Sequence, residues 1–226
     1  MVKLFAHRGF VKDSQKENSI ASLQEAVLQD FSAIEFDIWF IAEKLILKHD
    51  CPKENELAEL PTLRDYFIHK NNLTYWLDFK NLDEENASKV LLLVKKEIEF
   101  AHVNLDQIYF APFVIDKKKA EKIFLAIRNI FGEQAKIVAV CEELESKNSV
   151  LDLKQFLQKN NIKFLSIFHK LLTKDLLNIL SGIEIFAWTV NDPARLYELE
   201  KLGVENFATD KITPRIYVTE NSSRTS

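Results

Sequence analysis

Short apolar runs alternate along this chain with longer segments whose apolar residues recur at helical spacing. Runs of four to eight residues bounded by turn residues are typical of buried strands, whereas spacing of three and four residues indicates amphipathic helices. We predict strands over 3–7, 33–40, 73–79, 107–110, 136–140, 163–168, 183–190 and 206–209. We predict helices from 18, from 61, over 83–99, 116–130, 151–159 and 173–180, and from 192 to Gly203.

Helix boundaries are marked by capping residues. Asn18 is expected to cap the first helix, and Thr62 with Asp65 resembles a capping box. Asp83 and Asp116 are expected at the starts of the two longest helices, and proline follows aspartate at 192–193. These signals place a helix after each of the first seven strands.

One further strand, over 44–48, follows the second strand too closely for a crossover helix. Parallel strands need a connection of a dozen or more residues, so this pair is predicted to be an antiparallel hairpin with its turn near Ala42-Glu43.

Eight strands with seven intervening helices and short connections predict a parallel sheet closed into a small α/β (β/α)₈ TIM barrel. We expect one barrel domain over 1–215 and a polar C-terminal tail over 216–226. The alternative is a doubly wound open sheet. It is disfavoured because the chain has four glycines and no GxGxxG phosphate loop.

Composition narrows the functional classes. The 226 residues are 47% hydrophobic and 28% charged, as in ordinary globular proteins, and the formal net charge of −4 disfavours a nucleic-acid partner. No apolar run approaches the ~20 residues needed to span a bilayer, and the N-terminus does not resemble a signal peptide, so we expect a cytoplasmic protein. Cys51 and Cys141 do not suggest a disulfide framework, and the sequence indicates no particular oligomeric state.

The strand at 33–40 carries two acidic residues on one face. Glu35 and Asp37 alternate with Ile34, Phe36 and Ile38, so the carboxylates share the face opposite the large apolar one. The apolar face suits the helix layer, and the acidic face must then point into the barrel. Buried carboxylates need cations or hydrogen-bond partners, and Mg²⁺ and Ca²⁺ prefer such oxygen ligands. The alternative is an amphipathic edge strand facing water.

Other charged residues recur at strand ends. Asp78 and Lys80 end the third strand, where they form either part of the same site or a local ion pair. Ala6-His7-Arg8-Gly9 ends the first strand and His49-Asp50 ends the hairpin. Barrel enzymes keep their sites at this end, and histidines, cations and carboxylates together suit phosphoryl chemistry.

With these motifs the sequence resembles the glycerophosphodiester phosphodiesterase family, whose fold is a (β/α)₈ barrel. The matching segments stand in family order from the first strand to the last. They are Ala6-His7-Arg8-Gly9, Glu17-Asn18-Ser19, Ile34-Glu35-Phe36-Asp37, His49-Asp50, Leu60-Pro61-Thr62-Leu63, Leu77-Asp78-Phe79-Lys80, Ala187-Trp188-Thr189-Val190-Asn191 and Thr209-Asp210.

The resemblance implies a metal-dependent hydrolase that converts glycerophosphodiesters, small-molecule substrates of lipid metabolism, to an alcohol and glycerol 3-phosphate. It implies the following roles: His7 and His49 as the acid/base pair, Arg8, Lys80 and Trp188 as substrate-binding residues, and Glu35, Asp37 and Asp78 as ligands of Mg²⁺ or Ca²⁺. In that family a neighbouring hydroxyl often attacks the phosphorus, and water then opens the cyclic phosphate.

The sequence departs from the family pattern at two places. The third carboxylate is usually a glutamate, whereas here it is Asp78. Only the nine residues 51–59 separate the His49-Asp50 pair from Leu60, where many members have a long insertion, so a more open site mouth is expected. Two alternatives therefore stay open: a phospholipase D-like or cyclising activity on a lysolipid, and a non-catalytic barrel that binds a phosphorylated ligand.

Two residues are weaker candidates. Glu17 is expected to support the site rather than to bind the ligand directly. His169 ends a strand and either reaches the mouth or is an ordinary polar strand end.

Overall fold

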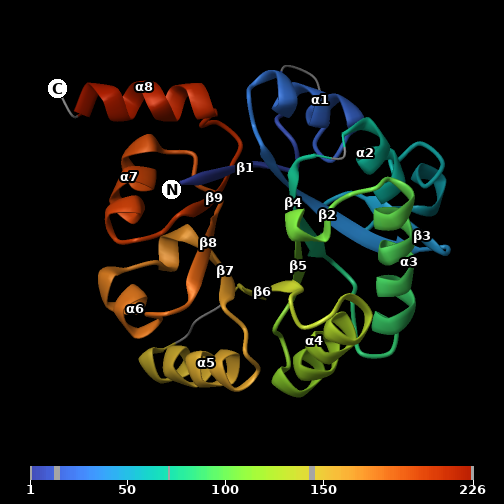
Figure 1. The fold of residues 1–226 in the computed structure, drawn as a ribbon. Helices are drawn as coiled ribbons and strands as arrows, with labels where there is room; N and C mark the ends of the chain where they lie inside the picture. Colours follow the sequence, from blue (N-terminus) through green and yellow to red (C-terminus); the bar gives the residue numbers. More distant parts are fainter. Residues whose placement is uncertain (1, 13–15, 71, 143–145, 225–226) are drawn as a thin grey trace.

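A closed barrel of eight parallel strands forms the centre of the molecule, in a computed structural model that describes residues 2–12, 16–70, 72–142 and 146–224 (Figure 1). Around the barrel the strand order is β1, β2, β4, β5, β6, β7, β8, β9, and β9 pairs with β1. Their bounds are β1 (Lys3–His7), β2 (Ala33–Ile41), β4 (Thr74–Phe79), β5 (Ile108–Pro112), β6 (Lys136–Cys141), β7 (Phe164–Phe168), β8 (Glu184–Trp188) and β9 (Asn206–Thr209). The predicted (β/α)₈ fold is confirmed.

Helices surround the strands as a ring (Figure 1). They are α1 (Ile20–Leu28), α2 (Leu63–His69), α3 (Ala87–Phe100), α4 (Lys117–Phe131), α5 (Lys147–Lys159), α6 (Lys174–Ile179), α7 (Pro193–Lys201) and α8 (Pro214–Arg224). Three short 3₁₀ turns cover Glu54–Glu56, Leu105–Gln107 and His169–Leu171. None of the helices in the described ranges is long and apolar enough to cross a membrane.

The predicted hairpin is also confirmed. Strand β3 (Lys44–Leu47) pairs antiparallel with the end of β2, in the register Ile38 to Leu47. Ala42 and Glu43 both have positive φ, at 49° and 62°. Two such residues give the turn twist that matches a tight hairpin. The hairpin extends β2 beyond the barrel and carries the chain to His49.

Two separate apolar cores follow from the period-two alternation of the strands. Ile34, Phe36 and Ile38 pack toward the helices in the larger core. Ala33 and Trp76 belong to the smaller core inside the barrel. The alternation predicted for the second strand is therefore correct, and it sends Glu35 and Asp37 inward.

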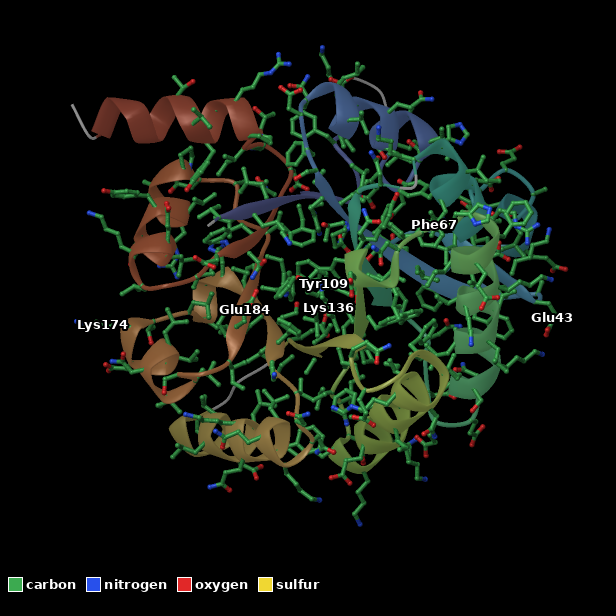
Figure 2. All side chains as sticks on the ribbon, viewed as in Figure 1. Glu43, Phe67, Tyr109, Lys136, Lys174 and Glu184 are labelled. Atoms are coloured by element: carbon green, nitrogen blue, oxygen red, sulfur yellow. The ribbon has the colours of Figure 1, made fainter. Side chains whose placement is uncertain are left out.

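The amino-terminal end of the barrel is closed by polar side chains (Figure 2). The amines of Lys136 and Lys3 lie 4.9 and 5.6 Å from the centre of the Tyr109 ring. Burial, and then the charge of Lys136, lower the pKa of Lys3. Glu184 accepts a 2.7 Å hydrogen bond from Asn206 at the same end. The cavity lined by the strand-end side chains lies at the opposite, carboxyl-terminal end.

The structure corrects some predicted boundaries. Ser19, not Asn18, caps α1, because Asn18 has φ of 53° and its side chain is used elsewhere. Asp83 accepts hydrogen bonds in the turn before α3, which begins at Ala87. Helix α5 begins at Lys147 instead of 151.

Helix α8 covers Pro214–Arg224, so residues 216–224 of the expected tail are helical. Tyr217 in α8 donates a 2.7 Å hydrogen bond to Glu200 of α7. Residues 225–226 of the tail lie outside the described residues.

Candidate active site

A small cavity of about 60 Å³ lies at the carboxyl end of the barrel. The eight residues to which the family resemblance gives roles all border it, together with several apolar and polar neighbours. The lining residues are His7, Arg8, Glu35, Asp37, His49, Trp76, Asp78, Lys80, Phe113, Val140, Glu142, Ser166, Trp188 and Ala208. The fold therefore gathers strand-end residues from His7 to Ala208 around one space.

His7 is held by a carboxylate from the far end of the chain. Its Nδ1 lies 2.7 Å from Oδ1 of Asp210, and its Nε2 lies 3.8 Å from Oε2 of Glu35. Asn191 fixes Asp210 by donating to its Oδ2 (2.8 Å) and accepting from its backbone N–H (2.8 Å). An ionised carboxylate can only accept, so Nδ1 carries the proton and Nε2 is directed toward the cavity.

Barrel closure explains this contact. Strand β1 pairs with β9 in the register Ala6 to Thr209, so the residues that follow, His7 and Asp210, emerge side by side. Thr209-Asp210 is one of the segments that match the family, but the histidine that Asp210 contacts lies 203 positions away in the chain. Only the closing strand pair reveals the histidine–carboxylate contact.

The chain turns sharply after His7. Arg8 has φ of 56° and Gly9 has φ of 79°. A Cβ at Gly9 would clash with the side chain and backbone of Ser22, so both the conformation and the close approach require glycine. The turn aims the Arg8 backbone N–H at Oε2 of Glu35, at 3.0 Å.

The Arg8 guanidinium bridges two carboxylates. Its Nε lies 3.2 Å from Oδ2 of Asp37, and its Nη1 donates to Glu17 at 3.0 Å. Glu17 therefore supports Arg8 from outside the cavity, as predicted.

Three inward carboxylates form a cluster. One oxygen from each of Glu35, Asp37 and Asp78 lies within 4.8 Å of the other two. Asp37 and Asp78 are paired across β2 and β4, and the Lys80 amine lies 2.8 and 2.7 Å from them. Asp78 and Lys80 therefore form a local ion pair and also belong to the site.

Asn18 supports the site, although the sequence predicts it to be a helix cap. Its Nδ2 donates to Oδ2 of Asp37 at 2.7 Å, and its Oδ1 accepts from the Asp37 backbone N–H at 3.1 Å. Its positive φ turns the amide away from the helix and toward β2. Asn18 thus fixes the orientation of the most buried carboxylate of the cluster, that of Asp37, which is 1% exposed.

Burial and mutual repulsion shape the ionisation of the cluster. Burial, with the charge of Asp37, raises the pKa of Glu35 to about 8. Burial also raises the pKa of Asp78 to about 6, although Lys80 opposes this shift. For Asp37 the charges of Lys80 and Arg8 outweigh burial, so its pKa is lowered.

The cluster fits a divalent cation on its own chemistry. Oδ1 of Asp78 is buried and has no hydrogen-bond partner among the described residues. Three carboxylate oxygens form the kind of hard ligand set that Mg²⁺ and Ca²⁺ take. A cation would also keep Glu35 and Asp78 ionised at neutral pH. Glu35, Asp37 and Asp78 are therefore the residues that could hold the metal.

The ionisation of His7 follows from the same charges. Burial alone would lower its pKa, but Glu35 and the hydrogen bond to Asp210 outweigh it, so the pKa of His7 is raised. For Asp210 the hydrogen bond from His7 outweighs burial, and its pKa is lowered. The two groups therefore stabilise each other's charged forms.

His49 lies at the outer edge of the cavity. Its side chain is 38% exposed, and its Nδ1 lies 2.9 Å from Oδ1 of Asp50. The indole of Trp39 donates a 3.1 Å hydrogen bond to the His49 carbonyl and so anchors the end of the hairpin. This arrangement leaves the imidazole at the mouth, consistent with the second histidine predicted for the site.

A wider groove of about 540 Å³ continues outward from His49 and Lys80. Its apolar lining residues are Phe79, Leu82, Phe113, Ile115 and Ile123. Ile115 is 91% exposed, so this side of the groove faces solvent.

Of the two remaining candidates, Trp188 borders the cavity and His169 does not. Trp188 borders the cavity, and its ring packs against Phe168 with 5.3 Å between centres. His169 begins a 3₁₀ turn after β7 and does not border the cavity. Its carbonyl accepts a hydrogen bond from Arg195 of α7, so the alternative of an ordinary strand end is the correct one.

Comparisons with known proteins bear on the fold. No family model matches the sequence, and no curated protein matches it. Among solved structures, a glycerophosphodiester phosphodiesterase from Parabacteroides distasonis ATCC 8503 is 20% identical, with a TM-score of 0.76 over 100% of this chain and 98% of that one. A phosphodiesterase from Oleispira antarctica, solved with the product sn-glycerol-3-phosphate, is 17% identical, with a TM-score of 0.76 over 99% and 97%.

A glycerophosphoryl diester phosphodiesterase, also from Parabacteroides distasonis ATCC 8503, is 15% identical, with a TM-score of 0.65 over 99% and 87% of the two chains. At these identities the likeness establishes the barrel fold over the whole chain. The names of these structures agree with the family resemblance of the sequence motifs.

Proposed function

We propose that this chain is a metal-dependent phosphodiesterase that hydrolyses glycerophosphodiesters to an alcohol and glycerol 3-phosphate. The observation that carries the proposal is the convergence of His7, His49 and the Glu35–Asp37–Asp78 cluster on one cavity, with Arg8 and Lys80 beside them. The names of the structures that share the fold support it.

Arg8 and Lys80 are the phosphate-binding groups of this proposal. Both cations border the cavity, and both already contact Asp37, at 3.2 and 2.8 Å. A phosphodiester brings one negative charge to this space, which the guanidinium fork and the amine can share. A divalent cation held by the three carboxylates would supply further positive charge next to the phosphate.

The two histidines supply proton transfer. Asp210 holds the proton on Nδ1 of His7, so the lone pair lies on Nε2, which is 3.5 Å from the Thr189 hydroxyl. Nε2 can therefore take a proton from the attacking hydroxyl as the oxygen–phosphorus bond forms. His49, at the open mouth, gives a proton to the oxygen of the departing alcohol as its bond to phosphorus breaks. If the attacking hydroxyl belongs to the glycerol unit, a cyclic phosphate results, and water opens it to the monoester with the histidine roles reversed.

The experiment compares His7→Ala and His49→Ala with the wild type on glycerophosphocholine in the presence of Mg²⁺ or Ca²⁺. We expect each variant to lose about 10²- to 10⁴-fold in kcat, the usual contribution of general acid–base catalysis, with unchanged melting temperature. His69→Ala is the matched control, because His69 is exposed on α2 and does not border the cavity. Wild-type turnover by either site variant would contradict the assigned role.

A second candidate, cleavage of a lysolipid with release of a cyclic phosphate, is favoured by the apolar groove beside His49. Phosphorus NMR separates the two activities. Accumulation of a monoester supports hydrolysis, whereas a persistent cyclic product without a monoester supports the cyclising reaction.

A further inference from the structure

Strand β2 extends further than the strand beside it in the barrel. It runs to Ile41, whereas β4 ends at Phe79, which is paired with Ile38. The backbone N–H of Lys80 donates a 2.9 Å hydrogen bond to the Ile38 carbonyl, the outermost backbone bond between the two segments. Beyond that bond, no strand of the described residues lies against this edge of β2.

The side chain of Asn81 takes the place of the missing strand. Its Oδ1 accepts a 2.8 Å hydrogen bond from the backbone N–H of Phe40, and its Nδ2 donates a 2.9 Å hydrogen bond to the Phe40 carbonyl. One amide therefore pairs both backbone groups of Phe40, as a neighbouring strand would. Phe40 is half-buried, and backbone groups in such places need partners. We call the Asn81 side chain and the Phe40 backbone the Asn81 clamp.

The Asn81 clamp is itself held in place by the start of α3. Nδ2 of Asn86 donates a 2.8 Å hydrogen bond to the Asn81 carbonyl. Oδ1 of Asn86 accepts a 3.1 Å hydrogen bond from the backbone N–H of Asp83. The clamp therefore ties the outer end of β2 to the turn between β4 and α3.

Phe40 is linked to His49 through the next residue in the chain. The indole N–H of Trp39 donates a 3.1 Å hydrogen bond to the His49 carbonyl. Among the described residues the His49 imidazole has one hydrogen-bond partner, Asp50, whose carboxylate is 85% exposed. A contact that is so open to water fixes a ring weakly. The position of the imidazole therefore depends on the backbone of the hairpin.

A second tie between α3 and the hairpin lies on the surface. The Lys89 amine is 2.6 Å from Oε1 of Glu43 in the hairpin turn. The two side chains are 58% and 70% exposed, and Glu43 lies at the outer edge of the molecule (Figure 2). Exposed ion pairs hold their elements weakly. The Asn81 clamp is therefore the stronger of these two ties.

We propose that Asn81 and Trp39 are positioning residues for His49. Asn81 fixes the outer end of β2, and Trp39 transfers that position to the His49 backbone. The inference rests on the proposed function, in which His49 gives a proton to the departing alcohol. Without the clamp, β3 stays paired with β2, but the hairpin can swing and the imidazole loses its fixed distance to the leaving oxygen.

The experiment compares two diesters of glycerol 3-phosphate that differ in the leaving group. Choline needs a proton from an acid as it departs, whereas para-nitrophenol leaves readily as the phenolate. Release of each alcohol in a single turnover reports the bond-breaking step alone. Asn81→Ala and Trp39→Phe should slow choline release about 10- to 100-fold, the cost of a misplacement of about 1 Å. They should leave para-nitrophenol release within about threefold of the wild type, in the pattern expected for His49→Ala.

Lys89→Ala is the matched control, because it removes the exposed tie to the same hairpin and should leave both rates unchanged. The double variant Asn81→Ala/His49→Ala should release choline no more slowly than His49→Ala, because the clamp acts through that imidazole. The inference is overturned if Asn81→Ala slows both esters equally, as loss of the fold or of Lys80 would, or slows neither. Additive losses in the double variant also overturn it.

A measurement without substrate separates this inference from the proposed function. In Asn81→Ala the Phe40 amide should exchange its hydrogen roughly 10-fold faster, the effect of losing about one hydrogen bond, and the NMR signal of the His49 ring should move. These changes in a protein that hydrolyses neither ester would support the clamp and contradict the proposed enzyme. Unchanged exchange and an unmoved His49 signal, in a protein that hydrolyses both esters, would contradict the clamp alone.

Discussion

Replacing Asp210 by asparagine tests whether this carboxylate sets the proton on His7. The carboxylate accepts on both oxygens, from His7 Nδ1 at 2.7 Å and from Asn191 Nδ2 at 2.8 Å. An amide has one oxygen and one NH₂ group, so it cannot accept from both. If its oxygen stays on His7, its NH₂ faces the NH₂ of Asn191. If it turns over, its NH₂ faces Nδ1 and drives the His7 proton to Nε2.

In the second arrangement His7 no longer has a lone pair on the cavity side. We expect kcat/KM to fall about 10²- to 10⁴-fold, the range for loss of a general base, which corresponds to about 3–5 kcal/mol of transition-state free energy. Because Asp210 helps to raise the pKa of His7, the acid limb of the pH–rate profile should also move to lower pH. The assay is hydrolysis of glycerophosphocholine between pH 5 and 9.

A melting temperature close to that of the wild type shows that the substitution spares the fold. Asp192→Asn is a control, since Asp192 caps α7 and does not border the cavity. Activity of Asp210→Asn within threefold of the wild type, with an unmoved acid limb, would show that Asp210 does not set the position of the His7 proton.

Two further predictions concern the carboxylate cluster. Asn18→Ala removes both hydrogen bonds that orient Asp37, so Mg²⁺ or Ca²⁺ should bind about 10- to 100-fold more weakly by calorimetry, and unchanged affinity would contradict the supporting role. In EDTA, the free energy of unfolding should fall as pH rises from about 5 to about 8, because native Glu35 with a pKa of about 8 keeps a proton that the unfolded chain, near 4.5, has released. The raised pKa of His7 acts in the same direction, and the lowered pKa values of Asp37 and Asp210 act only at lower pH. Urea unfolding at several pH values measures this dependence. Mg²⁺ should lessen the fall in the free energy of unfolding. A free energy of unfolding that rises with pH in EDTA would contradict the prediction.

The barrel could be predicted from sequence because its rules are local. Period-two alternation in 33–40 and the spacing of strands and helices depend on neighbours in the chain, and both are confirmed. The gathering of His7, Glu35, Asp37, His49 and Asp78 followed from one further rule, that the strand ends of a barrel meet at one face.

The missed features depend on contacts between distant segments. Asn18 has the chemistry of a helix cap, and only the three-dimensional approach of its loop to β2 shows that its amide serves Asp37. Asp210 meets His7 through barrel closure.

The central claim is that this cavity hydrolyses glycerophosphodiesters with the help of a divalent cation. The most direct measurement is phosphorus NMR of the purified wild type with glycerophosphocholine, with Mg²⁺, with Ca²⁺ and with EDTA. We expect the diester signal to give way to glycerol 3-phosphate with at least one cation and to persist in EDTA. An unchanged diester with every cation, or equal conversion in EDTA, would contradict it.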